Sequence, residues 1–264
     1  MIKIQYIESK VKFHRANILK TIHKSKKGHI GGSLSCLDIL CSIYYSKIFD
    51  FRKKDKFLLS KGHAALSLYS VLEDLKYSKY IRTKNFNRYP SFLTEHPQLN
   101  KKLKGIEFES GSLGNGLGVG SGIAFGNKLS KKKSKIIVLI GDGELYEGST
   151  WEALLFAKHY NLNNLKIIVD VNDLIILGKT QDCLNLDPID KKIEGLGIEC
   201  FKINGHSINE ITKSLNQIEK NKNLSCILAK TIKGKGSSIM ENKKNWHYWN
   251  PMSDEQIRKT REEL

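Results

Sequence analysis

The second half of the chain alternates short apolar runs with helical segments, and this alternation restricts the fold more than any other feature. Strands are predicted over 135–141, 165–171, 198–203 and 225–231. Helices are predicted over 117–129, 148–160 and 207–220. Strands that alternate with helices form a parallel sheet, because each crossover helix returns the chain to the same end of the sheet. We therefore predict an α/β fold, a parallel sheet with helices on both faces, with ligands bound outside the carboxyl ends of the strands.

The first half of the chain predicts helices that pack around this sheet. A helix with one basic side is expected over 5–24, and a helix that is apolar around most of its surface, and therefore buried, over 34–49. Ser33 or Ser35 is the expected N-cap of the second helix. The other predicted elements are a strand over 56–60, a helix over about 63–75, loops with short helices over 78–110 and a solvated helical tail over the last dozen residues. No linker or repeat separates these segments, so residues 1–264 are expected to form one domain.

The net charge of +17 requires an explanation. The lysines are dispersed in short runs such as Lys131–Lys133, and no aromatic-plus-basic cluster of the RNA-binding kind is present. We attribute most of the charge to a Lys-, Ile- and Asn-rich composition on solvated faces. Attraction of anionic substrates is a second interpretation. Nucleic-acid binding is not expected.

Membrane insertion and secretion are not expected either. No stretch reaches the roughly 18 apolar residues of a membrane span, and the first ten residues contain no signal-peptide core. The five cysteines show no CxxC spacing. We therefore expect free thiols in the cytoplasm, and no zinc site.

The segment Ile140-Gly-Asp-Gly-Glu144 directly follows a predicted strand and precedes a helix. Its glycines let the backbone approach a ligand closely, and a helix N-terminus favours phosphate oxygens. The next strand ends at Asn172, thirty residues after Asp142. Adjacent parallel strands would place these two oxygen ligands side by side. Magnesium prefers near-octahedral oxygen ligation with few protein ligands and substrate phosphates, so we predict a metal–diphosphate site here.

Gly-Asp-Gly followed about thirty residues later by Asn resembles the thiamine diphosphate motif, in its transketolase form. Other segments resemble that family in the same order along the chain, over roughly residues 10–250. They are Gly28-His-Ile-Gly-Gly-Ser-Leu-Ser35, Leu59-Ser-Lys-Gly-His-Ala64, Glu95-His-Pro97, Gly111-Ser-Leu-Gly-Asn-Gly-Leu-Gly118, Lys230-Thr-Ile-Lys-Gly-Lys-Gly236 and Asn245-Trp-His247. The chain is thus identified as similar to the N-terminal, diphosphate-binding part of a transketolase.

The resemblance implies roles for particular residues. It implies Mg²⁺, with Ca²⁺ or Mn²⁺ as substitutes, bound by Asp142, Asn172 and the carbonyl of Leu174. It implies thiamine diphosphate bound by His63, Ser112, Leu113, Gly114, Gly143, Glu144, Asn172, Ile176 and His247. It implies catalytic histidines, which move protons at sugar oxygens, at His29, His63, His96 and His247. Glu147 resembles the glutamate at the family's subunit interface. The other four histidines, His14, His23, His159 and His206, match no motif and are expected on the surface or in packing.

The family also requires a glutamate from a pyrimidine-binding domain, which these 264 residues do not contain. We therefore expect the alpha subunit of a split transketolase, which transfers a two-carbon ketol unit from a ketose (phosphate) to an aldose (phosphate). A second chain would carry the pyrimidine-binding and C-terminal domains, in an α₂β₂ assembly. Two alternatives stay open: a related carboligase that makes a modified sugar or metabolite, and a non-catalytic cofactor-binding scaffold.

Two segments depart from the family pattern. Tyr248 and Trp249 stand where relatives have Gly-Lys, and Asp173 and Ile175 interrupt the usual Asn-Gly-Leu-Gln. The aromatic pair would either narrow the substrate channel or serve only in packing.

Overall fold

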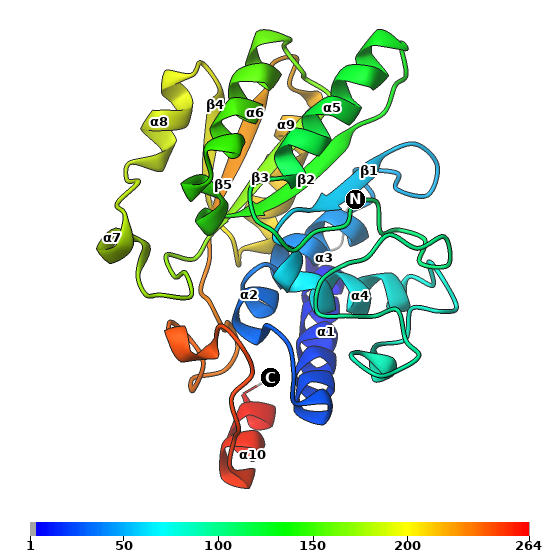
Figure 1. Ribbon diagram of the computed structural model, residues 1–264, viewed down its shortest axis with the longest axis vertical. Coiled ribbons are helices and arrows are strands. Elements are labelled where there is room, and N and C mark those ends of the chain that lie inside the picture. The colour runs from blue at the N-terminus through cyan, green and yellow to red at the C-terminus, as the bar shows by residue number, and fades with distance from the viewer. Residues whose placement is uncertain (1–3, 264) are drawn as a thin grey trace.

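A five-stranded parallel sheet forms the centre of residues 4–263, the part of the chain that the computed structural model describes (Figure 1). Its strands are β1 (Lys56–Leu59), β2 (Ile136–Gly141), β3 (Leu165–Val171), β4 (Glu199–Asn204) and β5 (Ser225–Lys230). They lie in the order β1-β2-β3-β5-β4, and each neighbouring pair is parallel. Because β2 pairs directly with β3, their carboxyl ends are adjacent, with Gly141 opposite Asp170.

Helices cover both faces of the sheet, because alternate side chains of each buried strand point to opposite sides. Ile137, Leu139 and Ile168 face one side, where they belong to a core shared with α1 (Ile4–Ser25), α3 (Leu37–Tyr45), α4 (Ala65–Asp74) and α9 (Ile208–Lys220). Val138 and Val169 face the other side, where they pack with α5 (Gly116–Leu129), α6 (Gly148–His159) and α8 (Ile189–Gly195). Figure 1 shows α5 and α6 on the near side of the sheet. The predicted α/β fold with helices on both faces is confirmed.

The predicted helix over 34–49 is instead two helices, and this part of the prediction is wrong. The chain forms α2 (Ile30–Ser35), turns at Cys36 and continues as α3. Neither serine caps α3. The hydroxyl of Ser33 donates to the carbonyl of His29 at 2.7 Å, and that of Ser35 donates to the Asp170 carboxylate at 2.6 Å. The Ser35 side chain thus links α2 to the end of β3.

The remaining elements are short. The helices α7 (Thr180–Cys183) and α8 follow β3 in a stretch for which the sequence predicted no helix, and the expected C-terminal tail is α10 (Asp254–Glu262). Four 3₁₀ turns cover Gly62–Ala64, Thr83–Asn85, Asp142–Tyr146 and Lys244–Trp246. Between residues 4 and 263, no helix has both the length and the apolar character needed to cross a membrane.

Candidate functional site

Asp142, the first residue after β2, joins the loops that follow β2 and β3. Its Oδ2 atom accepts hydrogen bonds from the backbone amides of Asn172 at 2.9 Å and Asp173 at 2.7 Å. Its Oδ1 atom accepts from the amide of Gly143 at 2.9 Å. The direct pairing of the two strands therefore brings Asp142 and Asn172 together, as their spacing predicted.

Glu144 holds the turn after β2 against two other loops. Its Oε2 atom accepts from the amide of Gly141 at 3.0 Å, and its Oε1 atom accepts from the amide of Gly114 at 3.2 Å. The hydroxyl of Ser60 also donates to Oε1. Burial raises the pKa of the Glu144 carboxyl group, and these donors oppose the rise. Glu144 thus positions the loop around Gly114, while its predicted contact with a cofactor stays a prediction.

A buried ion pair lies beneath the turn and was not predicted from the sequence. Lys61 Nζ pairs with the carboxylate of Asp170, and both side chains are fully buried. Ser35 and Thr231 also donate to this carboxylate. Burial alone would raise the pKa of Asp170, but Lys61 and the hydroxyl donors hold it below its usual value. The pair therefore places a fixed positive and a fixed negative charge directly behind Asp142. Lys61 lies in a motif that the sequence did single out, but its partner is 109 residues away.

These groups form one end of a cavity of about 500 Å³. Most of the residues predicted for the site line it: His29, His63, His96, Leu113, Asp142, Gly143, Glu144, Glu147, Asn172, Leu174, Ile176 and His247. Two do not. Ser112 is exposed on the neighbouring loop, and Gly114 lies behind that surface, where an added Cβ would meet the Glu147 side chain at 2.5 Å. Lys61, Tyr146 and Lys233 also line the cavity, although the sequence assigned them no role.

The four predicted histidines form one cluster. The ring of His29 is central, with its centroid 5.7 Å from that of His63, 5.2 Å from His96 and 5.3 Å from His247. The rings of His63 and His247 stack at 5.6 Å. Gly32 makes this packing possible, because a Cβ at this position would lie 2.6 Å from the His63 ring. The segment that carries His29 therefore needs glycine at position 32, where it passes the His63 ring.

Burial keeps three of these imidazoles, those of His29, His63 and His247, neutral near pH 7. It lowers the pKa of His29 to about 4, and the nearby His96 and Lys233 contribute. It lowers the pKa of His247 to about 3, where Lys233 is the next cause. Burial, with Lys61, also holds the pKa of His63 well below its usual value. Each of these rings can therefore donate one hydrogen bond and accept another.

The oxygen atoms at the buried end fit a hard divalent cation. Burial, together with the nearby Asp170 carboxylate, raises the pKa of Asp142 to about 6. The groups around the Asp142 carboxylate therefore neutralise only part of its negative charge. The amide oxygen of Asn172 and the carbonyl of Leu174 come from the adjacent loop. Among residues 4–263 no group of three His, Cys, Asp or Glu side chains could hold a metal. The fit therefore depends on amide and carbonyl oxygens, which Mg²⁺ accepts.

Lys233 adds positive charge at the same end. Its Nζ atom donates to the carbonyl oxygen of Leu174 at 2.8 Å and lies 2.9 Å from His247 Nδ1. Burial lowers the pKa of Lys233 to about 8, partly offset by Asp142. A buried ammonium group in the wall of the same cavity as Gly143 suits the oxygens of a diphosphate. The donor set thus fits both a cation and its diphosphate.

Tyr248 packs against the histidine cluster. Its hydroxyl donates to Glu95 Oε1 at 2.9 Å, and its ring packs edge-on against His29 at 5.0 Å. The neighbouring Trp249 instead points into packing, 5.8 Å from His23 and 6.4 Å from Trp246. Of the two aromatic residues that depart from the family pattern, only Tyr248 contacts the cluster.

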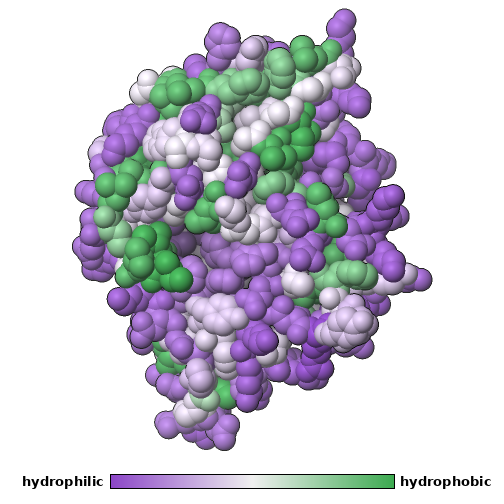
Figure 2. Space-filling view, viewed as in Figure 1, coloured by the Kyte–Doolittle hydropathy of each residue, from purple (hydrophilic) through white to green (hydrophobic). Residues whose placement is uncertain are grey.

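Hydrophobic side chains are exposed around this site. Val119, Leu155 and Phe156 on α5 and α6 are 38–55% exposed, and Ile176 and Leu177 at the cavity rim are 66% and 72% exposed. Figure 2 shows hydrophobic residues gathered over α5 and α6, above a hydrophilic hollow near the middle of this face. Glu147 is also exposed, close to the same helices.

A parallel α/β sheet with an acidic turn after one strand, an asparagine after the next and a basic end to its cavity is typical of a domain that binds a diphosphate at the carboxyl ends of its strands. The sequence pattern of the "Transketolase, thiamine diphosphate binding domain" matches residues 7–264. The chain therefore belongs to the transketolase family and is a thiamine diphosphate-binding domain of that family.

Individual relatives agree with this assignment. The chain is 38% identical, over 94% of its length and 92% of the relative's, to an apulose-4-phosphate transketolase subunit of Actinobacillus succinogenes. It is 34% identical, over 87% of its length and 88% of the relative's, to a 6-deoxy-6-sulfo-D-fructose transketolase subunit of Clostridium sp.. Over 96% of the chain, the structure matches the crystal structure of Campylobacter jejuni transketolase, with a TM-score of 0.86 and 31% sequence identity. The chain spans 42% of that protein.

Proposed function

We propose that this chain is the diphosphate-binding subunit of a two-chain transketolase, which transfers a two-carbon ketol unit from a ketose to an aldose. The cluster of four histidines beside an oxygen-rich, basic cavity end carries this proposal. Two relatives that match most of the chain are named as transketolase subunits. Residues 1–264 act as one domain in this scheme. The five cysteines are free thiols, which supports a cytoplasmic location.

The substrate is a sugar that carries an anionic group. The names of the two relatives given above refer to a sugar phosphate and to a sulfonated sugar. This chain offers a basic environment, with Lys61 and Lys233 in the cavity wall. The net charge of +17 favours the approach of anions.

Asp142, Asn172 and the Leu174 carbonyl hold Mg²⁺, for which Ca²⁺ or Mn²⁺ can substitute. Gly143 and Lys233 would hold the diphosphate at this end of the cavity, where Lys233 supplies an ammonium group. When bound, thiamine diphosphate supplies the electron sink that carbon–carbon bond cleavage requires. The exposed Ile176 lies at the rim, where it would pack near the ring of the bound cofactor.

The histidines orient the sugar and hold its protons. His63 and His247 lie close to Lys233, at the diphosphate end, and act nearest the reacting carbons. His29 and His96 bind the donor and acceptor hydroxyl groups. Because burial keeps the rings of His29, His63 and His247 neutral, one nitrogen of each ring can accept a proton from a hydroxyl while the other donates a hydrogen bond.

The second chain supplies the pyrimidine-binding domain with its glutamate, and the complex is α₂β₂. The exposed side chains of α5 and α6, with Glu147, form the surface that this assembly covers. A hydrophobic surface of this kind is typical of subunit interfaces.

Reconstitution tests this proposal. The chain would be mixed with a candidate partner that carries a pyrimidine-binding domain, in the presence of thiamine diphosphate and Mg²⁺. Transfer from ketose donors to aldose acceptors, with and without a phosphate, would be followed by mass spectrometry. We expect transfer only when both chains are present. A reconstituted complex that binds the cofactor but transfers nothing between any pair would exclude the ketol-transfer activity.

A further inference from the structure

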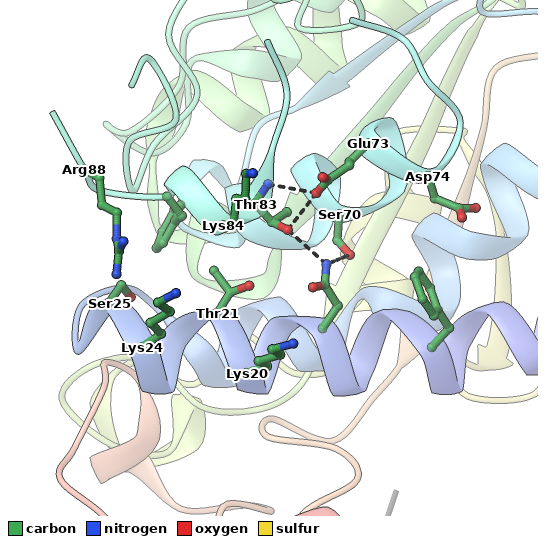
Figure 3. A pocket seen from close by; sticks show the side chains of 13 residues that line it. Lys20, Thr21, Lys24, Ser25, Ser70, Glu73, Asp74, Thr83, Lys84 and Arg88 are labelled. Carbon is green, nitrogen blue, oxygen red and sulfur yellow. Dashed lines mark hydrogen bonds between the residues drawn. The ribbon is translucent and has the colours of Figure 1, made fainter. Parts of the chain in front are cut away.

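A second cavity, of about 480 Å³, lies between α1, α4 and the segment 83–88. None of its lining residues lines the cavity that holds the histidine cluster. Figure 3 shows α1 along one side and the loop with Lys84 and Arg88 along the other. The volume is that of a site for a small molecule.

Positive charge dominates one part of this cavity. Lys20 and Lys24 come from α1, and Lys84 and Arg88 come from the facing loop. Within residues 4–263 no carboxylate lies within 4.0 Å of any of these four cations. Figure 3 shows Arg88 extending from the loop toward Ser25 at the end of α1, with Lys24 beside it. All four side chains are exposed, and they line one cavity from two segments far apart in the sequence, which makes an anion the natural occupant.

The two carboxylates in the lining are already engaged elsewhere. Glu73 accepts from the amide of Thr83 at 2.8 Å and from its hydroxyl at 2.6 Å. Asp74 pairs with Lys10 at 2.8 Å and accepts from the hydroxyl of Tyr45. They therefore do not neutralise the four cations, and the cavity keeps an excess of positive charge.

Two phenylalanines, Phe13 and Phe86, and several uncharged polar side chains form the rest of the lining. Thr21 is buried and projects into the cavity, and its hydroxyl has no hydrogen-bond partner among the described residues (Figure 3). The amide nitrogen of Asn17 donates to Ser70 Oγ at 2.9 Å and Thr83 Oγ1 at 3.2 Å. This holds the Asn17 side chain in place with its oxygen free to accept. A ligand with hydroxyl groups as well as an anionic end would satisfy these side chains.

We propose that this cavity binds a small phosphorylated polyol or sugar, with the phosphate between Lys24, Lys84 and Arg88 and the hydroxyl groups toward Thr21 and Asn17. The Arg88 guanidinium can bond two phosphate oxygens at once, and the lysines add point charges. The site lies outside the transfer reaction and does not depend on the function proposed above.

The cavity adjoins the histidine cluster through one aromatic ring. Phe86 forms part of the cavity wall and is buried. Gly28, next to His29, lies against the same ring, so that a Cβ on Gly28 would be 3.0 Å from Phe86. A ligand held by Lys84 and Arg88 fixes the loop that carries Phe86. Binding therefore also alters the surroundings of His29.

Calorimetric titration of the full chain tests the site. The probes are sorbitol 6-phosphate, inorganic phosphate and sorbitol, because sorbitol 6-phosphate has no carbonyl group and is neither a ketose donor nor an aldose acceptor. We expect saturable binding of sorbitol 6-phosphate, weaker binding of phosphate and none of sorbitol. Lys84→Glu/Arg88→Glu should weaken sorbitol 6-phosphate binding by at least about tenfold, since two charge-assisted contacts become repulsive.

The matched control is Lys213→Glu/Lys220→Glu, the same charge change at exposed positions of α9 outside the cavity. It should leave the affinity within about twofold, which separates a specific site from general attraction by the net charge. Lys233→Met tests whether the probe enters the histidine cavity instead. Histidine NMR spectra should show a His29 shift on ligand addition in the wild type and none in Lys84→Glu/Arg88→Glu.

Three results would overturn the proposal: no saturable binding, equal losses in both double variants, or loss of binding in Lys233→Met alone. Binding without any change at His29 would disprove the link through Phe86. Because no partner chain or cofactor is used, failure of the transketolase assignment would leave these results unaffected.

Discussion

At the scale of single residues, the carboxylate of Asp142 contributes most to the organisation of the site. It is buried, close to Asp170, and it organises the loops after β2 and β3 through three backbone amides. Asp142→Ala should abolish Mg²⁺-dependent binding of thiamine diphosphate to the reconstituted complex, measured by calorimetry. The control is Asp182→Ala, an exposed aspartate on α7. An Asp142→Ala complex with wild-type affinity for the cofactor would show that the cation binds elsewhere.

His63 and His247 should matter for the reaction more than for cofactor binding. Their stacked rings lie beside Lys233, and both are kept neutral by burial. Replacing either with Ala should lower kcat/KM by roughly 10²–10⁴-fold, the usual contribution of a general acid–base group. Cofactor affinity should fall far less than in Asp142→Ala. The exposed His159 provides the control substitution. Equal losses of affinity and turnover would mean that these rings only hold the cofactor.

Tyr248 is the residue whose substitution best tests what determines substrate preference. Its bond to Glu95 and its contact with His29 place it over the histidine cluster. Tyr248→Gly should change the relative kcat/KM values for a panel of ketose donors and aldose acceptors, phosphorylated and not, because it enlarges the channel. Tyr248→Phe should retain most of the wild-type preference, and Tyr80→Gly on the surface should change nothing. If Tyr248→Gly keeps the wild-type preference, and that preference is for xylulose 5-phosphate and ribose 5-phosphate, the ring serves only in packing.

At the scale of elements, a buried histidine ties three helices together on one face of the sheet. His14 in α1 bonds Ser70 of α4 at 2.8 Å and Tyr45 of α3 at 2.7 Å. Burial lowers its pKa from 6.5 to about 4; Asp74 opposes this fall and Lys10 adds to it. The folded state therefore binds fewer protons than the unfolded state between these pH values, so stability is full above pH 6.5 and is lost as the pH falls toward 4.

This predicts a measurable acid sensitivity. Between pH 6.5 and 4, protonation of His14 in the unfolded state should lower the free energy of unfolding by about 3 kcal/mol, because folding lowers the pKa of His14 from 6.5 to about 4. Urea denaturation at pH 7.0 and 4.5 measures it. His14→Gln should be less stable than the wild type at pH 7 but should lose less stability on acidification. Parallel losses in the two proteins would assign the acid sensitivity to the carboxylates instead.

Elements and motifs differed in how far the sequence could predict them. The strand β2 was predictable because it is a continuous apolar run, and β3 because Leu165, Ile167, Ile168, Val169 and Val171 make it predominantly apolar and β-branched. The positions of Asp142 and Asn172 followed from strand pairing. The break at Cys36 was not predictable, because it depends on Ser35 reaching Asp170, 135 residues away. The bond between Tyr248 and Glu95 spans 153 residues. Such contacts depend on tertiary packing, which single-sequence periodicity does not encode.

At the scale of the whole molecule, hydrophobic residues gather on one part of the surface. Hydrophilic residues cover much of the face in Figure 2, yet α5 and α6 expose Val119, Leu155 and Phe156. A charge of +17 keeps the isolated chain soluble and repels identical copies. The same charge favours a partner that presents acidic groups around an apolar centre. Assembly would cover this surface and bring the second chain toward the exposed rim of the histidine cavity.

The last prediction concerns that assembly. Leu155, at 55% exposure on α6, should be buried against a neighbouring chain, so Leu155→Arg should lower the molar mass of the reconstituted complex in size-exclusion chromatography with light scattering. Leu99→Arg makes the same change at a leucine of 57% exposure in the loop before α5 and should leave the mass unchanged. Thermal melts of both isolated variants would establish that folding is intact, because neither side chain is in the core. Transfer activity should fall with the mass of the complex in Leu155→Arg. Full activity and an unchanged mass in this variant would place the interface between chains on another face of the molecule.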